Sequence, residues 1–283
     1  PSSAASDVYK RQFQNLPRKF KTAISGNARQ DVVHEINDLA FIGVEHPELG
    51  PGFECYVGGG LSTNPMLAQS LGAFVTLEQV PDVWANVVRI FRDYGYRRLR
   101  NRARLKFLVK EWGVEKFRRI LEEDYLGYAL ADGPKAPNNL VDRDHIGVHE
   151  QKDGNVYIGV KPTLGHMSGE QLIALADLAE QYGVTDLRFT PFKEVLLLGV
   201  EPEDVEKLQS DLEQMGLYSK PSEFRRGLLS CTGLEYCKLA HVTTKSRAIE
   251  LADELEERFG DLDSPITISL NGCPNACARH QVS

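Results

Sequence analysis

Long apolar segments are missing from this sequence of 283 residues. No run approaches the roughly 18 consecutive apolar residues of a membrane-spanning helix, and no apolar segment with a cleavage site opens the chain. An excess of positive charge is missing as well, because 33 lysines and arginines stand against 40 aspartates and glutamates. Non-specific binding to nucleic acid requires many cations that face phosphate. We therefore expect a cytoplasmic protein that binds neither membrane nor nucleic acid.

Cysteine is also scarce, with five in the chain, of which four lie in its last fifth. This distribution does not resemble the disulfide framework of a secreted protein. In a reducing compartment, a cluster of cysteines usually binds metal. The composition is otherwise ordinary, with 42% hydrophobic and 26% charged residues, and the length allows two or three compact units.

The first half of the chain contains signals for strands and helices. Residues 1–12 show no hydrophobic period, so we expect a leader that is foreign to the protein and exclude it from the fold. Two apolar stretches between Leu39 and Val57 flank a Pro/Gly-rich turn and predict a β-hairpin. Thr63-Asn64-Pro65 then predicts a capped helix over MLAQSLGAF, and apolar spacing predicts further helices over 80–95 and from Val114 to Tyr125.

A regular series of elements follows a stretch rich in Pro, Gly and Asn, Ala129 to Asp144, which we interpret as the domain boundary. The expected elements are strands over 145–149 and 156–160, a helix over 170–182, strands over 187–190 and 195–200, and a helix over 202–215. This β-β-α-β-β-α order predicts an α+β unit with helices on one face of a mainly antiparallel sheet. The last segment should add a helix over 245–259 and a short strand, ITISL.

The four clustered cysteines form two pairs. Cys231 and Cys237 are separated by five residues in CTGLEYC, and Cys273 and Cys277 by three in CPNAC. Zinc sites favour two to four intervening residues, whereas the four thiolates of a [4Fe-4S] cluster accept such spacing. Spacing alone therefore leaves open an iron–sulfur cluster, zinc and unliganded buried thiols. Cys55, alone at the end of an apolar strand, is expected in a core.

The sequence around these cysteines resembles that of a known family. C-T-G-x-x-x-C followed by N-G-C-P-N-x-C resembles the cluster signature of the sirohaem and [4Fe-4S] sulfite and nitrite reductases. The resemblance extends over 13–283, includes LPRKFK, HEIND and VGGGLS, and is strongest to ferredoxin-dependent sulfite reductases of actinobacterial type. It implies that the four cysteines hold the cluster and that Cys277 also bridges it to the sirohaem iron.

The resemblance also implies a domain organisation. Residues 13–133 would form a first sirohaem-binding α/β domain and 134–220 a ferredoxin-like half-domain. Residues 221–283 would begin a second sirohaem and [4Fe-4S] domain. By this comparison the chain is a fragment that lacks an earlier ferredoxin-like half and everything after the cluster loop. The sequence leaves open whether the chain alone binds sirohaem or is active.

Two lysines in LPRKFK are candidates for catalysis. In an extended segment Lys19 and Lys21 project to one side, with Arg18 and Phe20 opposite. Two neighbouring ammonium groups suit a small oxyanion, and their mutual repulsion should lower each pKa and so ease proton donation. A solvated edge strand is the simpler alternative. The resemblance implies that both are substrate-side lysines.

Two further segments are candidates for binding sirohaem. Gly58, Gly59 and Gly60 precede the helix expected after Thr63, so their N–H groups could approach a carboxylate or phosphate, although such a run is often only a turn. The run RRLRNRARLK holds six basic residues, a pattern typical of a solvated helix face or a nucleic-acid patch. The resemblance implies that the glycine loop approaches sirohaem and that cations offset its eight carboxylates. We expect contacts from the basic side chains Arg100, Arg104 and Lys106.

Two remaining residues are expected near the cofactors. Asn275 could donate to a cluster sulfur or fix the ligand loop. Arg188 aligns with an arginine that the family places near the cofactor, but Lys193 stands where relatives often have glutamine, which puts the polar contacts of this strand in question.

The resemblance implies six-electron reduction of sulfite to sulfide, with reduced ferredoxin as electron donor and sirohaem and [4Fe-4S] as cofactors. Reduction of nitrite to ammonia is the nearest alternative, because both small oxyanions need the same iron, electrons and protons. A zinc-stapled or Fe-S electron-transfer protein without catalysis is the alternative from another class. It would leave LPRKFK without a role.

Overall fold

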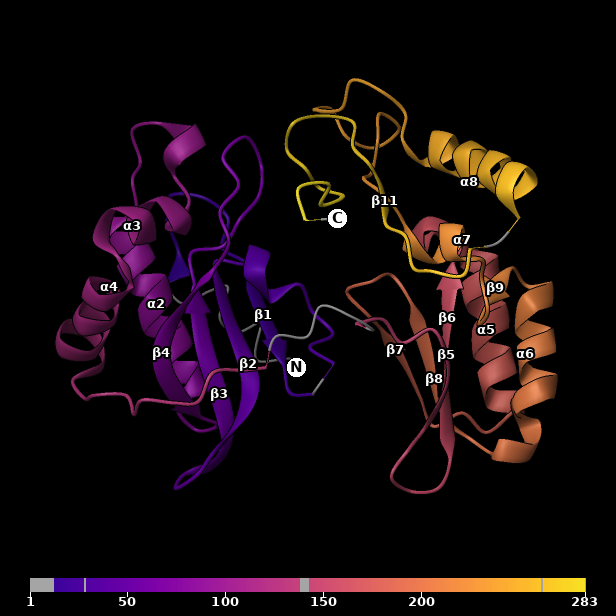
Figure 1. Ribbon diagram of the computed structural model, residues 1–283, viewed down its shortest axis with the longest axis horizontal. Helices are drawn as coiled ribbons and strands as arrows, with labels where there is room; N and C mark the ends of the chain where they lie inside the picture. Colours follow the sequence, from indigo (N-terminus) through magenta and orange to yellow (C-terminus); the bar gives the residue numbers. More distant parts are fainter. Residues whose placement is uncertain (1–12, 28, 138–142, 261, 283) are drawn as a thin grey trace. The chain divides into compact units, whose positions relative to one another are not determined.

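The computed structural model describes residues 13–27, 29–137, 143–260 and 262–282. It divides the chain into two compact units, residues 1–143 and 144–283 (Figure 1). The expected foreign leader lies outside the described residues. The finer division at residues 133 and 220 stays a prediction. No helix in the described part of the chain is long and apolar enough to cross a membrane.

The first unit contains a four-stranded sheet in the order β1-β2-β3-β4. The strands are β1 Thr22–Ser25, β2 Leu39–His46, β3 Gly50–Val57 and β4 Gln69–Thr76. The predicted hairpin is confirmed, since β2 and β3 pair antiparallel from Leu39 opposite Val57 to His46 opposite Gly50. β1 joins the other side of β2 in parallel, which makes it an edge strand of this sheet.

The helix predicted after Pro65 is wrong, because this segment forms β4. Leu71, Ala73 and Val75 are buried in alternation, which is the period of a strand with one face on a core. Gly72 adopts a φ of 65°, a left-handed value that an α-helix interior does not contain. The cap signal at Thr63 lies in an irregular segment instead. Pairing with β3 outweighs this cap signal, because the edge of β3 that does not face β2 offers backbone donors and acceptors to this segment.

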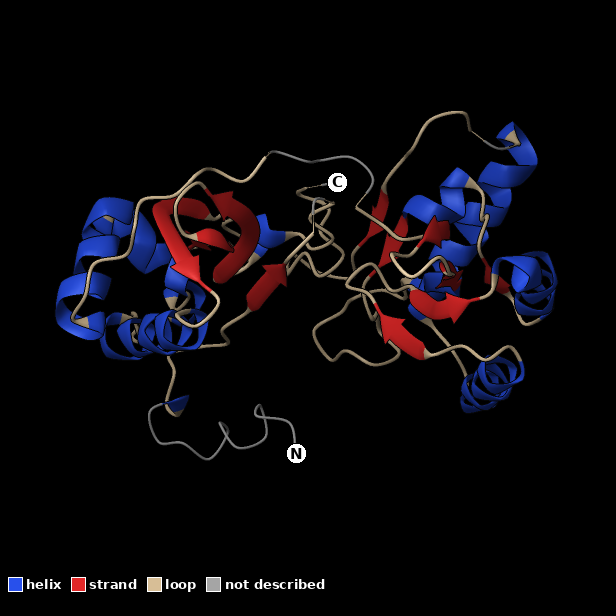
Figure 2. Cartoon of the chain, turned by 90° about the horizontal axis from the view of Figure 1, so that it is seen from below, coloured by secondary structure: helices blue, strands red, loops and turns tan. Residues whose placement is uncertain are grey.

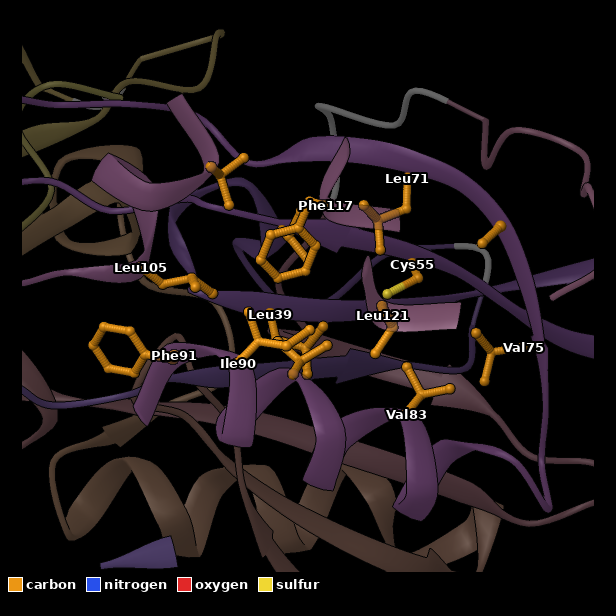
Figure 3. Close-up of a cluster of buried hydrophobic side chains, with 14 of the residues drawn as sticks. Leu39, Cys55, Leu71, Val75, Val83, Ile90, Phe91, Leu105, Phe117 and Leu121 are labelled. Atoms are coloured by element: carbon orange, nitrogen blue, oxygen red, sulfur yellow. The ribbon is translucent and has the colours of Figure 1, made fainter. Parts of the chain in front are cut away.

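Helices cover one face of this sheet as a separate layer (Figure 2). They are α2 Val80–Tyr94, η3 Arg100–Arg102, α3 Leu105–Trp112, α4 Val114–Ile120 and the π-helical turn η4 Leu121–Leu126. The two predicted helices over 80–95 and 114–125 are confirmed. Figure 3 shows the core between the layers, with Leu39, Cys55, Leu71, Val75, Val83, Ile90, Phe91, Leu105, Phe117 and Leu121. Cys55 is fully buried there, as predicted.

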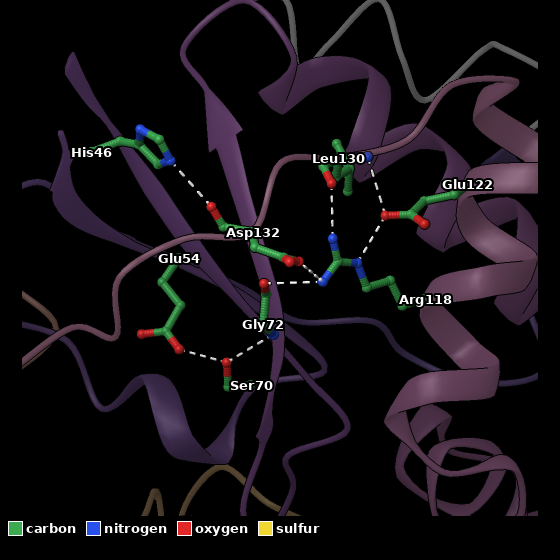
Figure 4. A network of polar contacts seen from close by, with 8 residues as sticks. All are labelled: His46, Glu54, Ser70, Gly72, Arg118, Glu122, Leu130 and Asp132. Atoms are coloured by element: carbon green, nitrogen blue, oxygen red, sulfur yellow. Dashed lines mark hydrogen bonds and ion pairs between the residues drawn. The ribbon is translucent and has the colours of Figure 1, made fainter. Parts of the chain in front are cut away.

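Arg118 fastens this helical layer to the edge strand β4 (Figure 4). Its guanidinium donates to the carboxylates of Glu122 at 2.8 Å and Asp132 at 2.7 Å. It also donates to the carbonyl oxygens of Gly72 at 3.0 Å and Leu130 at 2.8 Å. One side chain of α4 thus satisfies acceptors from η4, β4 and the segment that follows the helices.

The second unit begins with the predicted α+β arrangement. Its strands are β5 Gly147–Glu150, β6 Val156–Pro162, β7 Asp186–Phe189, β8 Val195–Val200 and β9 Leu217–Tyr218. All pairs are antiparallel in the order β5-β6-β8-β7, with β9 beside β6. The helices α5 Gly169–Gln181 and α6 Val205–Gln214 lie together on one face (Figure 1), and short turns occur at η5 Thr163–Gly165 and η6 Pro202–Asp204. The predicted fold class is therefore confirmed.

The end of this unit carries the clustered cysteines. It contains α7 Glu223–Gly227, β10 Leu228–Ser230, α8 Lys245–Phe259 and β11 Ile268–Leu270. The helix predicted over 245–259 and the strand predicted at ITISL are both confirmed. A small core of Leu164, Leu228, Ala248 and Ala252 packs α8 against the rest of the unit.

Candidate functional site

Two parallel strands bring the cysteine loops to one place. β10 pairs with β11 from Leu228 opposite Ile268 to Ser230 opposite Leu270. The pairing continues for one residue, because the Cys231 N–H donates to the Leu270 carbonyl at 3.0 Å. Parallel strands end at the same edge of a sheet, so the loop that contains the first cysteine pair and the loop that contains the second start side by side.

Gly272 joins these two loops. Its N–H donates to Cys231 Sγ at 3.2 Å, and its carbonyl accepts from the His241 N–H at 2.9 Å. A Cβ at this position would lie 3.0 Å from the Ala240 Cβ, so a larger residue would push the loops apart. The residue directly before Cys273 therefore touches the thiol of Cys231.

The Cys231 sulfur lies in surroundings that favour a thiolate. Burial raises the pKa of this thiol, but its hydrogen bonds with the Gly272 N–H, the Thr244 hydroxyl and the Gly233 N–H, with the charge of Lys193, outweigh the effect of burial. The pKa of Cys231 is therefore below its ordinary value. Backbone N–H groups directed at sulfur are also a means by which proteins hold iron–sulfur clusters and tune their potentials.

The other cysteines lie in the same loops and differ in exposure. Cys237 and Cys273 are half-buried, Cys277 is exposed, and no cysteine of the chain is in a disulfide. Among the described residues, no three side chains of His, Cys, Asp or Glu are arranged to hold one metal ion. The backbone thus brings the loops together, whereas the ligand set of four cysteines stays a prediction.

An asparagine that was not predicted from the sequence bridges the two ends of the second loop. The Asn271 Oδ1 accepts the Ala278 N–H at 2.7 Å and so spans both cysteines of CPNAC. Asn275, the predicted donor, is half-buried, and its contact with a cluster sulfur stays a prediction.

Half-buried cations lie near the first cysteine, and this group was not predicted from the sequence. The ammonium of Lys193 donates to the Ser230 carbonyl at 2.9 Å, directly before Cys231. Burial, followed by the charges of Lys245, Lys161 and Arg279, lowers the pKa of Lys193 to about 8. Cations here would offset the negative charge of thiolates and of a cluster. These cations come from distant parts of the sequence, so no local pattern predicts that they lie near the cysteine.

Arg188 lies on β7, an edge strand of its sheet, with its guanidinium exposed. It donates to the Asp186 carboxylate two residues earlier at 2.8 Å. The predicted contact of Arg188 with a cofactor stays a prediction.

The two candidate lysines precede β1 in the first unit. Lys19 is exposed and Lys21 is half-buried. Phe20 between them packs into the core, with its ring centroid 5.9 Å from that of Phe91 and 6.5 Å from that of Trp84. An inward Phe20 supports the predicted alternation, in which both lysines project to the other side.

A buried ion pair fixes the backbone beside Lys21. The Asp38 carboxylate is fully buried and accepts from the Arg104 guanidinium at 2.6 and 3.2 Å. The same carboxylate accepts the Lys21 N–H at 2.9 Å. Asp38 was not predicted from the sequence as a site residue, although it lies in the HEIND segment.

The glycine loop does not offer the donors that were predicted. The N–H groups of Gly58, Gly59 and Gly60 already donate, at 2.8 to 2.9 Å, to the carbonyl oxygens of Asp38, Asn37 and Met66. The next element after the loop is the strand β4, so the predicted helix N-terminus is not there to assist it. Gly59 is required for another reason, because a Cβ there would lie 2.3 Å from the Glu35 carbonyl oxygen. Contact of these glycines with sirohaem stays a prediction, but anion binding by their N–H groups is wrong for this structure.

The three cations predicted to contact sirohaem differ in their surroundings. Arg100 is exposed in η3. Arg104 is buried against Asp38, and the buried Lys106 ammonium donates to the carbonyl oxygens of Gly60, Leu61 and Asn64 at 2.6 to 3.1 Å. The predicted contacts stay predictions, and they are best supported for Arg100, since the donors of the other two act within the unit.

Comparisons with known proteins show the family of this chain. A sequence model described as the nitrite and sulphite reductase 4Fe-4S domain matches residues 5–129, and one described as the nitrite/sulfite reductase ferredoxin-like half domain matches 149–215. Sulfite reductase [ferredoxin] 2 of Mycolicibacterium paratuberculosis is 53% identical over all of this chain and 52% of its own length. The chain belongs to the nitrite and sulfite reductase family.

Other members of this family are similar over the same part. Sulfite reductase [ferredoxin] of Mycobacterium tuberculosis is 51% identical over all of this chain and 52% of its own length. The ferredoxin–nitrite reductase of Synechococcus elongatus is 36% identical over 96% of this chain and 53% of its own length. The solved structure of the Mycobacterium tuberculosis NirA protein matches with a TM-score of 0.92 and 52% identity, over 96% of this chain and 50% of that one. The chain spans about half the length of the family members it matches.

Neither matched family segment includes the four clustered cysteines. The first segment contains only Cys55, which is buried in a core, and the second contains no cysteine. The assignment of iron ligands therefore rests on the sequence motif and on the adjacent loops after β10 and β11.

Lys106 leads to a prediction about pH. Burial, followed by the charge of Arg104, lowers its pKa to about 8. The unfolded chain holds this proton more tightly, so the free energy of unfolding should rise between pH ~8 and ~10, by on the order of 1 kcal/mol. Below that range both states are protonated and the pH has no effect through this group. Urea denaturation of the protein and of Lys106→Met, compared pH by pH, checks the rise. It should be absent in Lys106→Met and kept in Lys110→Met, whose lysine is exposed; parallel curves for all three proteins would contradict it.

Proposed function

We propose that this chain is part of an enzyme that reduces sulfite to sulfide with six electrons, using sirohaem and a [4Fe-4S] cluster. The observation that carries the proposal is the adjacency of the two cysteine loops at the end of β10 and β11, where Gly272 touches Cys231. The relatives named as ferredoxin sulfite reductases support the choice of reaction, because they are 51 to 53% identical to all of this chain.

The cluster would be held by Cys231, Cys237, Cys273 and Cys277, and Cys277 would also bridge it to the sirohaem iron. The surroundings of Cys231 fit an anionic cluster, because N–H donors and cations converge there. When bound, the two cofactors would supply the electrons for reduction of the anion. The cysteine loops hold that source of electrons, and their thiols require a reducing compartment, which supports a cytoplasmic location.

Lys19 and Lys21 would bind the oxyanion and assist its reduction. Each oxygen that leaves as water needs protons, which the two ammonium groups would donate. Their charges also oppose that of the anion and so favour its binding. Arg100 would offset carboxylates of sirohaem, since its guanidinium is exposed.

Ferredoxin is the proposed electron donor, because the relatives at 51 to 53% identity carry ferredoxin in their names. Nitrite is the second candidate substrate. The relatives named nitrite reductases are 32 to 36% identical to this chain, which favours sulfite over nitrite.

An absorption spectrum of the purified full-length protein, with iron and zinc analysis, tests the proposal. Sirohaem should give intense Soret-type and long-wavelength bands, and assays with reduced ferredoxin or methyl viologen should yield sulfide from sulfite faster than ammonia from nitrite. Zinc without a macrocycle, or iron without sirohaem bands, would instead indicate a zinc-stapled or electron-transfer protein.

A further inference from the structure

We propose that Asp38 and Arg104 form a positioning pair that fixes the backbone of Lys21 and so directs its side chain. This inference rests on the proposed function, in which Lys21 acts on the oxyanion. It assigns to Arg104 a role within the first unit in place of the predicted contact with sirohaem.

Three hydrogen bonds hold the two peptide groups of Lys21. Its N–H donates to Asp38 Oδ2 at 2.9 Å. Its carbonyl accepts the N–H of Asp38 at 3.0 Å and the N–H of Leu39 at 3.2 Å. The side chain and backbone of Asp38 thus form hydrogen bonds with the N–H and the carbonyl of Lys21.

Arg104 fixes the Asp38 carboxylate that accepts the Lys21 N–H. Its Nη2 donates to Asp38 Oδ2 at 2.6 Å and its Nε to Asp38 Oδ1 at 3.2 Å, so both carboxylate oxygens are held. Two bonds from a planar guanidinium prevent rotation of the carboxylate, which a single bond from an ammonium would not. Both side chains are buried, with exposed fractions of 7% for Arg104 and 0% for Asp38. A buried carboxylate without its cation would be strongly unfavourable.

The pair also joins Lys21 to the glycine loop. The Asp38 carbonyl accepts the Gly58 N–H at 2.9 Å, and a Cβ at Gly60 would lie 3.4 Å from Arg104 Nη2. The guanidinium is therefore packed between Asp38 and Gly60, with little room to turn toward another partner.

The position of Lys21 in the sheet makes such fixation necessary. Lys21 directly precedes β1, which among the described strands pairs with β2 alone. The ends of edge strands fray readily, and a displacement of about 1 Å at a catalytic group can lower a rate on the order of a hundredfold. In this proposal Asp38 and Arg104 contact neither the substrate nor the cofactors, so they act through Lys21.

A double-mutant cycle in the full-length protein tests the pair. Asp38→Asn leaves one side-chain oxygen where three donors converge, so either the Lys21 N–H or the guanidinium loses its partner. It should lower kcat/KM for the anion by on the order of tenfold at unchanged sirohaem content. In a Lys21→Met background, where the ammonium is already absent, the same change should have less than about a twofold further effect.

Two more variants complete the experiment. Arg104→Lys keeps the buried positive charge but can hold only one carboxylate oxygen firmly, so it should repeat the result if Asp38→Asn fails to fold. Glu122→Gln is the matched control, because it weakens another ion pair of the same unit, at 2.8 Å, that does not touch Lys21. It should lower the unfolding midpoint and leave kcat/KM unchanged.

The outcomes separate the inference from the function on which it rests. Additive losses in the Asp38→Asn/Lys21→Met protein, or loss of sirohaem bands in Arg104→Lys, would overturn the positioning role. Unchanged turnover in Lys21→Met alone would overturn the proposed function of Lys21, whatever the other variants do.

Discussion

Replacing Cys277 by serine in the full-length protein is expected to abolish sulfite reduction, with a loss of turnover on the order of a hundredfold or more. In the proposed function the Cys277 thiolate would be both a cluster ligand and the bridge to the sirohaem iron, so one change would remove an iron ligand and the electron path. Serine is a poorer ligand for iron than a thiolate. Optical and electron paramagnetic resonance spectra should show altered sirohaem and cluster signals together.

Cys55→Ala is the matched control for this experiment. It also removes one thiol, but Cys55 is buried in the core of the first unit, away from both cysteine pairs in the sequence. The variant should unfold at a lower temperature and keep its iron content and spectra. Normal coupling between cluster and sirohaem in Cys277→Ser would remove the bridging role from Cys277.

Lys21→Met should keep both cofactors and lower kcat and kcat/KM, each by on the order of tenfold or more, which corresponds to about 1.4 kcal/mol or above in the transition state. Methionine keeps roughly the length of lysine and removes its charge. Both constants should fall because the ammonium would bind the anion and also assist bond cleavage. Steady-state assays with reduced ferredoxin or methyl viologen, beside optical spectra of each protein, measure the effect.

Lys110→Met provides the control for charge alone, since Lys110 is an exposed lysine of the same unit. Its kinetics should match those of the unaltered protein. If Lys21→Met with full sirohaem content turned over normally, Lys21 would have no place in the active site.

The elements that the sequence predicted well are those with local signals. The hairpin of β2 and β3 and the helices α2 and α8 each show an apolar period within their own residues. β4 was not predicted, because its stability depends on pairing with β3 and because Thr63-Asn64-Pro65 has the residue pattern of a helix N-terminus. α3 was not predicted, and only its first two residues belong to the basic run over 97–106.

The candidate site divides in the same way. The cysteine pairs could be found from spacing, because each pair lies within a few residues. The Asp38–Arg104 pair could not, since its members are 66 residues apart and nothing near either one indicates the other. Lys106 was predicted as a cation for a cofactor, whereas its ammonium binds three carbonyl oxygens of the loop after Gly59. Charge in a sequence thus shows that a partner is needed, but only the fold decides which partner.

The pairing of β10 with β11 has a consequence for the part that a cluster would play in folding. The two strands bring both ligand loops together with the chain's own hydrogen bonds and with the apolar contacts of Leu228 beneath α8. Small zinc domains, by contrast, draw their folding free energy from the metal. The chain's own contacts thus order these loops, so the free energy of coordination of the proposed cluster would contribute to retention of the cluster rather than to folding.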